Sequence, residues 1–138
     1  MPRKLLIACL TLTLVGSFYL SAIATPFARA VIVNTAFTVK AGDARYWSFK
    51  VGTDGANVVG RFRAEGGSRN DIRCLIMDPD SFENWRNGHS VRTYYNSDRI
   101  TVANIDVRLA EGDYVLVFDN TYSLLTNKAV TANVEMRW

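Results

Sequence analysis

The sequence has few of the residues that build reactive centres. Its 138 residues include two cysteines and one histidine, too few for a zinc site with several Cys or His ligands. Catalysis by a serine or cysteine would depend on His89 as the base, and no G-x-S-x-G motif is present. Cys74 and His89 form the one possible thiol–imidazole pair, but Cys74 alternates with Ile72 and Ile76, as a small buried residue would. These absences argue against an enzyme.

Long hydrophobic runs are also scarce, apart from one at the N-terminus. Two basic residues precede an apolar stretch from Leu5 to Leu20, and small residues follow it. This layout is typical of a secretory signal peptide. We predict cleavage after Ala30, which separates a signal peptide over 1–30 from a domain over 31–138. Cleavage after Ala24 is a second possibility, and an uncleaved membrane anchor over residues 5–24 is a third.

Loss of residues 1–30 changes the charge of the chain. The segment contains Arg3, Lys4 and Arg29 and no acidic residue, so the 16 basic and 13 acidic residues become 13 of each. The predicted domain is therefore neutral, which gives no support for nucleic-acid binding. Cys74 is its one cysteine, so it has no intrachain disulfide and must be stabilised by its hydrophobic core.

Alternation of apolar and polar residues is the main signal in the predicted domain and indicates β-strands. The predicted strands cover residues 31–39, 46–51, 58–65, 72–77, 91–95, 100–107, 114–119 and 130–138. One turn is expected at 96–98, and a bulge is expected near Asn104. Eight short strands without a crossover helix predict an all-β fold, an antiparallel two-sheet β-sandwich of jelly-roll or GOLD-like type.

A short helical turn is predicted between two of these strands, over 79–87. Asp78 suits the N-cap, Pro79 suits the first helical position, and Gly88 suits the C-terminal stop. Asp78, Asp80 and Glu83 could together supply carboxylate oxygens to a calcium ion. The alternative is that the two aspartates stabilise the positive end of the helical turn.

Several motifs in the second half of the chain resemble the GOLD domain of the emp24/gp25L/p24 family. They are Gly112–Asn120 (GDYVLVFDN), followed by Ser123 and by Lys128–Val130, and the earlier order of Tyr46–Val51 and Val59–Phe62 also fits. The p24 proteins typically carry a disulfide in this domain, and they continue into a coiled coil and a transmembrane helix. This sequence shows neither the disulfide nor the continuation. The resemblance therefore implies a GOLD-like sandwich with a role in protein interaction. Bacterial prepeptidase-type C-terminal domains have a similar strand order.

Exposed aromatic residues provide the main alternative function. Trp85, Tyr94 and Tyr95 could form a stacking platform for sugar rings, or they could close the ends of the sandwich. We expect an exported, non-enzymatic domain, periplasmic or secreted, that uses no cofactor and binds another exported or envelope protein. A carbohydrate-binding module that uses these three aromatic residues is the alternative.

Overall fold

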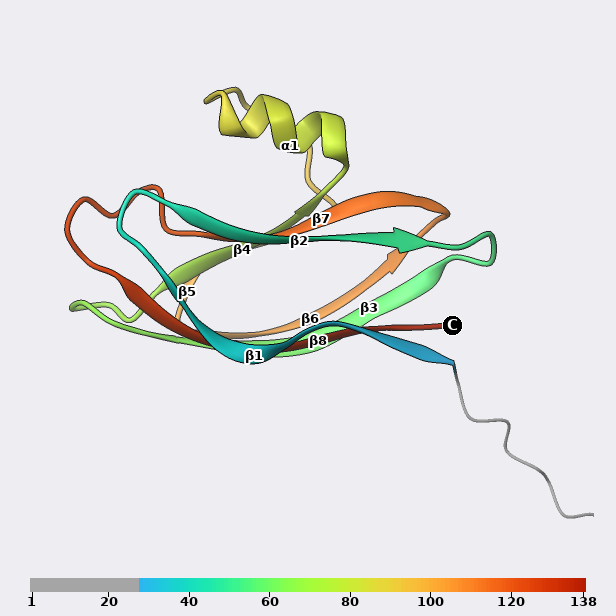
Figure 1. Ribbon diagram of the computed structural model, residues 1–138, viewed down its shortest axis with the longest axis horizontal. Helices are drawn as coiled ribbons and strands as arrows, with labels where there is room; N and C mark the ends of the chain where they lie inside the picture. Colours follow the sequence, from blue (N-terminus) through green and yellow to red (C-terminus); the bar gives the residue numbers. More distant parts are fainter. Residues whose placement is uncertain (1–27) are drawn as a thin grey trace, which may run out of the picture.

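Eight antiparallel strands form two four-stranded sheets that pack face to face, as the computed structural model of the chain shows for residues 28–138 (Figure 1). This confirms the predicted all-β sandwich. The signal peptide predicted over 1–30 lies mostly outside the described residues. The elements are β1 (Arg29–Val39), β2 (Ala44–Val51), β3 (Ala56–Glu65), β4 (Ile72–Met77), α1 (Pro79–Arg86), β5 (Tyr95–Ile100), β6 (Val102–Leu109), β7 (Gly112–Asp119) and β8 (Lys128–Arg137). No helix within 28–138 is long and apolar enough to cross a membrane.

The chain changes sheet at almost every connection. Sheet A has the strand order β1-β8-β3-β6, and sheet B has the order β2-β7-β4-β5. Hence β4 and β5 are the one pair of consecutive strands that share a sheet, and α1 connects them. The helix consequently lies against the outer face of sheet B, above the sandwich in Figure 1.

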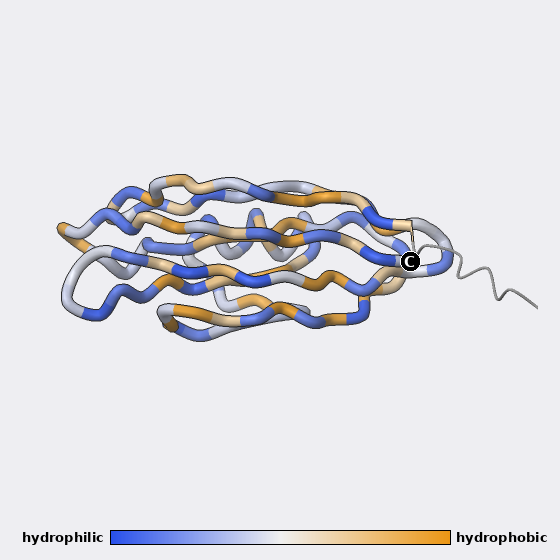
Figure 2. The backbone as a smooth tube through the Cα atoms, turned by 90° about the horizontal axis from the view of Figure 1, so that it is seen from below, coloured by the Kyte–Doolittle hydropathy of each residue, from blue (hydrophilic) through white to orange (hydrophobic). Residues whose placement is uncertain are grey.

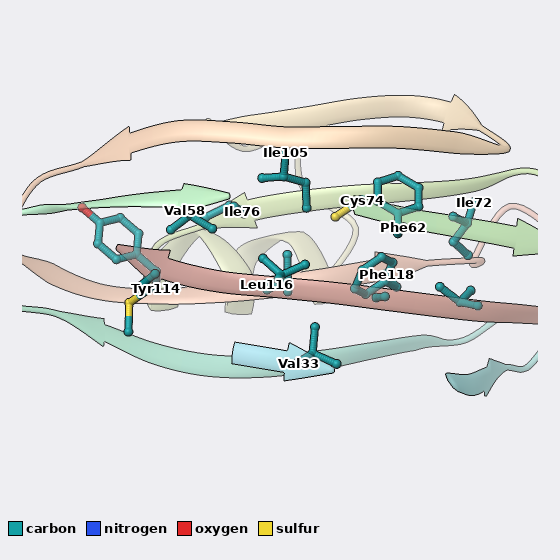
Figure 3. Packing of buried hydrophobic residues seen from close by; sticks show 14 of the residues in the cluster. Val33, Val58, Phe62, Ile72, Cys74, Ile76, Ile105, Tyr114, Leu116 and Phe118 are labelled. Atoms are coloured by element: carbon teal, nitrogen blue, oxygen red, sulfur yellow. The ribbon is translucent and has the colours of Figure 1, made fainter. Parts of the chain in front are cut away.

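The main core fills the space between the two sheets. Inward-facing residues alternate along each strand, and Figure 3 shows Phe62, Leu116 and Phe118 among them. The ring centroid of Phe118 lies 5.2 Å from that of Phe37 and 5.4 Å from that of Phe62, both in edge-on contacts. Such contacts add to the large hydrophobic area that these rings bury.

A second, smaller apolar cluster lies on the other side of sheet B. Strands β4 and β7 are apolar on both faces, so their alternate residues point outward instead of into the main core. Helix α1 covers these residues with Phe82, which is its one buried side chain. The buried members of this cluster are Leu75, Met77, Phe82, Val115 and Val117.

Local sequence signals predict α1 correctly. The Asp78 side chain accepts a hydrogen bond from the backbone N–H of Ser81 at 2.8 Å, Pro79 begins the helix, and Gly88 adopts a φ of 84° just after it. An N-cap carboxylate satisfies a backbone donor that would otherwise lack a partner. The capping residue therefore fixes where the helix begins.

The segment that follows the helix differs from the prediction made from the sequence. Residues 96–98, expected as a turn, lie inside β5, whereas residues 91–94 form no strand. The pairing of β4 with β5 shifts between Arg73 and Leu75, and the backbone N–H of Cys74 donates to Oγ of Ser97 at 2.8 Å. A side-chain oxygen thus replaces a backbone partner at the bulge.

Two smaller expectations around β6 are also wrong. The single strand expected over 100–107 is divided, because β5 ends at Ile100 in sheet B and β6 begins at Val102 in sheet A. The bulge expected near Asn104 is absent from the described pairing of β3 with β6, in which Arg61 lies opposite Asn104 in unbroken register.

Candidate functional site: a groove beside helix α1

An open groove of about 650 Å³ lies between α1 and the outer face of sheet B. It forms because an eight-residue helix covers only part of the apolar face of the sheet. Its lining comes from β2, β4, Asn96 of β5, the helix, the irregular segment after the helix, and the turns at Gly42 and Thr121. We call this feature the α1 groove.

One side of the α1 groove is aromatic. The rings of Tyr46 and Phe82 have centroids 4.7 Å apart, and Phe82 stacks on Trp85 with centroids 6.0 Å apart. Tyr46 remains 51% exposed. The guanidinium carbon of Arg86 lies 5.6 Å from the centre of the Phe82 ring, within the range of a cation–π contact. An apolar or aromatic group of a ligand could pack against this strip.

The lining of the groove also contains an arginine held by a buried carboxylate. Nε of Arg73 donates to Oδ2 of Asp119 at 2.7 Å, and Nη2 of the same guanidinium bonds to that oxygen. Oδ1 of Asp119 accepts hydrogen bonds from the backbone N–H and the hydroxyl of Thr121, at 2.8 and 2.6 Å. The Asp119 side chain is completely buried, whereas the Arg73 side chain is 34% exposed. A guanidinium has five N–H donors, so Arg73 can still bind a ligand carboxylate or carbonyl.

The three aromatic residues predicted as a sugar platform are not brought together. Trp85 lines the α1 groove, whereas Tyr95 packs against the main core on the other face of sheet B. The hydroxyl of Tyr95 donates to the backbone oxygen of Asn104 at 3.1 Å, and its burial raises its pKa to about 12. Tyr94 makes an edge contact with Tyr114, at 5.1 Å. The three rings therefore do not form one exposed row.

The three carboxylates predicted as a calcium site do not form a metal centre either. Oδ1 of Asp78 accepts from the backbone N–H of Ser81, and Oδ2 accepts from the hydroxyl of Ser81 at 2.8 Å. Glu83 instead pairs with Arg86 along the helix. Within residues 28–138 no group of three His, Cys, Asp or Glu side chains is placed to hold a metal ion. The alternative, a helix cap, is the role that the structure shows for Asp78.

Cys74 and His89 lie on opposite sides of sheet B. Cys74 is fully buried in the main core, and burial raises the pKa of its thiol well above the usual value. His89 lines the α1 groove on the outer side. The pair considered in the sequence analysis therefore does not form, and the thiol is protonated at neutral pH.

Two elements of the groove were not found from the sequence. Arg73 stands in a strand that is otherwise apolar, and this was the available signal that its side chain has a specific partner. The partner, Asp119, is 46 residues away in the chain. No pattern in the sequence indicated the contact of Tyr46 with Phe82, because this contact depends on how the helix is placed over β2.

A second exposed feature lies in the connection between β7 and β8. Leu124 and Leu125 are 90% and 94% exposed, yet the loop that carries them is well bonded. The Asn120 side chain donates to the backbone oxygens of Lys40 and Thr126, at 3.1 and 2.9 Å. The two leucines are therefore presented to solvent by a fixed loop, although they contribute almost no burial.

No model of a known protein family matches the chain, and no curated protein matches it.

Proposed function

We propose that this protein is an exported, non-enzymatic, GOLD-like domain that binds a segment of another exported or envelope protein in the α1 groove. The observation that carries the proposal is the lining of the groove, which combines an aromatic strip of Tyr46, Phe82 and Trp85 with the guanidinium of Arg73. Extended protein segments present an apolar side chain and backbone carbonyls a few ångströms apart. The aromatic strip offers a partner to the apolar side chain, and Arg73 offers one to a carbonyl.

The charges around the groove favour a partner segment with a carboxylate. Two arginines, Arg73 and Arg86, line the groove, and Asp43 is the one acidic residue among its lining side chains. Arg73 is already oriented by Asp119, so a ligand carboxylate would find its guanidinium in place. A preorganised arginine loses little side-chain entropy on binding, which increases its contribution to affinity.

Cross-linking of the tagged protein in its native compartment, followed by mass spectrometry, tests this function. We expect one recurrent protein partner whose recovery falls at least roughly tenfold in Trp85→Ala and Tyr46→Ala, because aromatic anchors commonly contribute more than 1 kcal/mol. Tyr94→Ala is the matched control, since Tyr94 is a comparably exposed tyrosine outside the groove. Recovery of polysaccharide without protein would contradict the proposal and favour the carbohydrate-binding alternative.

We also propose that export follows cleavage after Ala24 in preference to Ala30. Strand β1 begins at Arg29, and its first two residues pair with Arg137 and Met136 of β8. Cleavage after Ala30 would remove both of these paired residues, whereas cleavage after Ala24 would leave the strand whole. Sequencing the N-terminus of the exported protein distinguishes Thr25 from Val31 as the first residue.

A further inference from the structure

The loop between β7 and β8 and the loop between β3 and β4 lie together at one end of the sandwich, at the left of Figure 1. The two loops are in close contact, because a Cβ on Gly67 would lie 3.0 Å from Cγ2 of Thr126. The hydroxyl of Thr101 donates to the backbone oxygen of Arg69 at 3.1 Å, which holds the β3–β4 loop. The Asn120 side chain holds the other loop through the backbone oxygen of Thr126. Both loops therefore have a fixed shape.

A pocket of about 400 Å³ lies between these two loops. Asp71 is its one acidic lining residue, and Oδ1 of Asp71 accepts a hydrogen bond from Nζ of Lys128 at 2.9 Å, so these two charges offset each other. Arg69 and Arg99 also line the pocket, and both are exposed. Neither of them belongs to the five ion pairs that form within residues 28–138. The pocket therefore carries two uncompensated positive charges, and we call it the basic pocket.

Arg99 is oriented in the basic pocket by Tyr122. Its guanidinium carbon lies 4.8 Å from the centre of the Tyr122 ring, which is the distance of a cation–π contact. The hydroxyl of Tyr122 donates to the backbone oxygen of Asp71 at 2.9 Å, and this bond fixes the ring. A contact with the flat face of a guanidinium leaves the N–H groups at its edge available. They match the geometry of phosphate oxygens, which can accept two of them at once.

Two leucines project directly beside the basic pocket. Leu124 and Leu125 are 90% and 94% exposed, and the residues on either side of them, Ser123 and Thr126, line the pocket. Side chains that stand clear of their own loop to this degree are buried only by a partner that surrounds them. The acyl region of a bilayer surrounds such side chains without a preformed cavity, and its phosphate groups lie within reach of neighbouring basic residues.

We propose that this end of the domain docks on the surface of an anionic phospholipid bilayer. Leu124 and Leu125 enter the boundary between headgroups and acyl chains, while Arg69 and Arg99 bind a headgroup phosphate at the basic pocket. Both parts are needed, because one membrane signal alone gives marginal binding. The C-terminus lies at the opposite end of the sandwich in Figure 1. The α1 groove shares no lining residue with the basic pocket, so docking leaves the groove free.

Co-sedimentation with lipid vesicles of the chain as recovered from expressing cells tests the proposal. Binding to phosphatidylcholine vesicles that contain roughly 30% phosphatidylglycerol should be at least roughly tenfold tighter than binding to phosphatidylcholine alone. Leu124→Ser/Leu125→Ser should weaken this binding at least roughly tenfold, because little apolar surface then enters the bilayer. Arg69→Gln/Arg99→Gln should weaken it roughly twentyfold, since each arginine near an anionic surface contributes about a factor of five. Circular dichroism verifies that both variants keep the fold, which is expected because all four side chains are exposed.

Two double variants are the matched controls. Val31→Ser/Trp138→Ser removes exposed apolar side chains from the C-terminal end of the sandwich. Arg61→Gln/Arg92→Gln removes the same charge from exposed positions outside the basic pocket. Both should bind the anionic vesicles within roughly twofold of the wild type, because interactions between exposed charges are screened beyond a Debye length.

Three outcomes would overturn the proposal. One is a wild-type chain that does not bind anionic vesicles at roughly 1 mM lipid, a concentration at which even a single acyl chain gives detectable binding. If Leu124→Ser/Leu125→Ser instead lost a cross-linked protein, the leucines would belong to a protein interface. The second is a leucine variant that binds the vesicles as tightly as the wild type. The third is release of the chain by roughly 10 mM inorganic phosphate but not by sodium chloride of equal ionic strength, which would assign the basic pocket to a free anion.

Discussion

The outer faces of the two sheets differ much more than their inner faces. On sheet A most outward residues are polar or charged, such as Arg61 and Asn133, and Figure 2 shows many hydrophilic segments along this side of the molecule. On sheet B the outward residues of β4 and β7 are apolar and buried under α1. A sheet face needs a cover only where it is apolar, so the outer face of sheet B required the helix.

The same difference explains where the candidate binding site lies. At about 1.5 Å per residue, α1 is roughly 12 Å long, which is shorter than the strands beneath it. It buries Phe82 but leaves Trp85 and Tyr46 at the boundary of the covered region. The groove is thus the part of the apolar outer face of sheet B that the helix leaves uncovered. Within the described residues, sheet A has no comparable groove, because its outer face is mostly polar.

The largest effect is expected from a change in the core that both sheets share. Phe118→Ala removes a fully buried ring from β7 that contacts Phe37 and Phe62. We expect a loss of about 3–5 kcal/mol in the free energy of unfolding, measured by urea titration. Thr131→Ala, on the exposed face of sheet A, should change it by less than about 0.5 kcal/mol. Similar losses in both variants would contradict the assigned core.

A somewhat smaller effect is expected at the cover of sheet B. Phe82→Ala removes the one buried side chain of α1, and we expect a loss of about 2–3 kcal/mol, below the usual range for phenylalanine because the site lies near the surface. Hydrogen exchange should accelerate in 79–86 more than in β8. Uniform acceleration across both sheets would show that the helix is not a separable cover.

The contribution of one buried ion pair should appear as a dependence on pH. Burial opposes the ionisation of Asp71, but the Lys128 ammonium, 2.9 Å away, outweighs it, so the pKa of Asp71 lies below its ordinary value of 3.8. Since the folded-state pKa is the lower one, the ionised carboxylate stabilises the protein above pH 3.8, and this stabilisation is lost as the pH falls through the folded-state value. In unfolding experiments between pH 6 and about 2.5, the free energy of unfolding should therefore fall less in Asp71→Asn than in the wild type. An equal fall in both proteins would contradict this assignment.

A smaller effect is expected at the N-cap of α1. Asp78→Ala removes the acceptor for Ser81 and should reduce the unfolding free energy by about 1 kcal/mol. Asp80→Ala is the control, because Asp80 lies in the same turn but is not the capping residue. If both variants lost the same free energy of unfolding, the favourable interaction of any negative charge with the positive end of the helix dipole would account for the effect.

The sequence was sufficient for the features that depend on local pattern and insufficient for those that depend on distant pairing. Alternating residues identified most of the strands, and Asp78 with Pro79 identified the start of the helix. The prediction of a turn at 96–98 was wrong because the polar residues there lie at a bulge in β5, where Oγ of Ser97 accepts a hydrogen bond from the backbone N–H of Cys74. The groove was missed because its parts come from segments up to 79 residues apart, from Gly42 to Thr121, as the lining shows.

The smallest effect on stability, and the clearest separation of stability from surface function, is expected at the loop between β7 and β8. Leu124 and Leu125 are almost as exposed in the folded chain as in an unfolded one, so replacing both with serine removes little buried area. We expect the double variant Leu124→Ser/Leu125→Ser to unfold within about 0.5 kcal/mol of the wild type. A loss above about 2 kcal/mol would show instead that the two leucines pack against the fold. Since a well-bonded loop holds both leucines in solvent without stabilising the domain, removal of this apolar surface should increase solubility, measured by precipitation with ammonium sulfate.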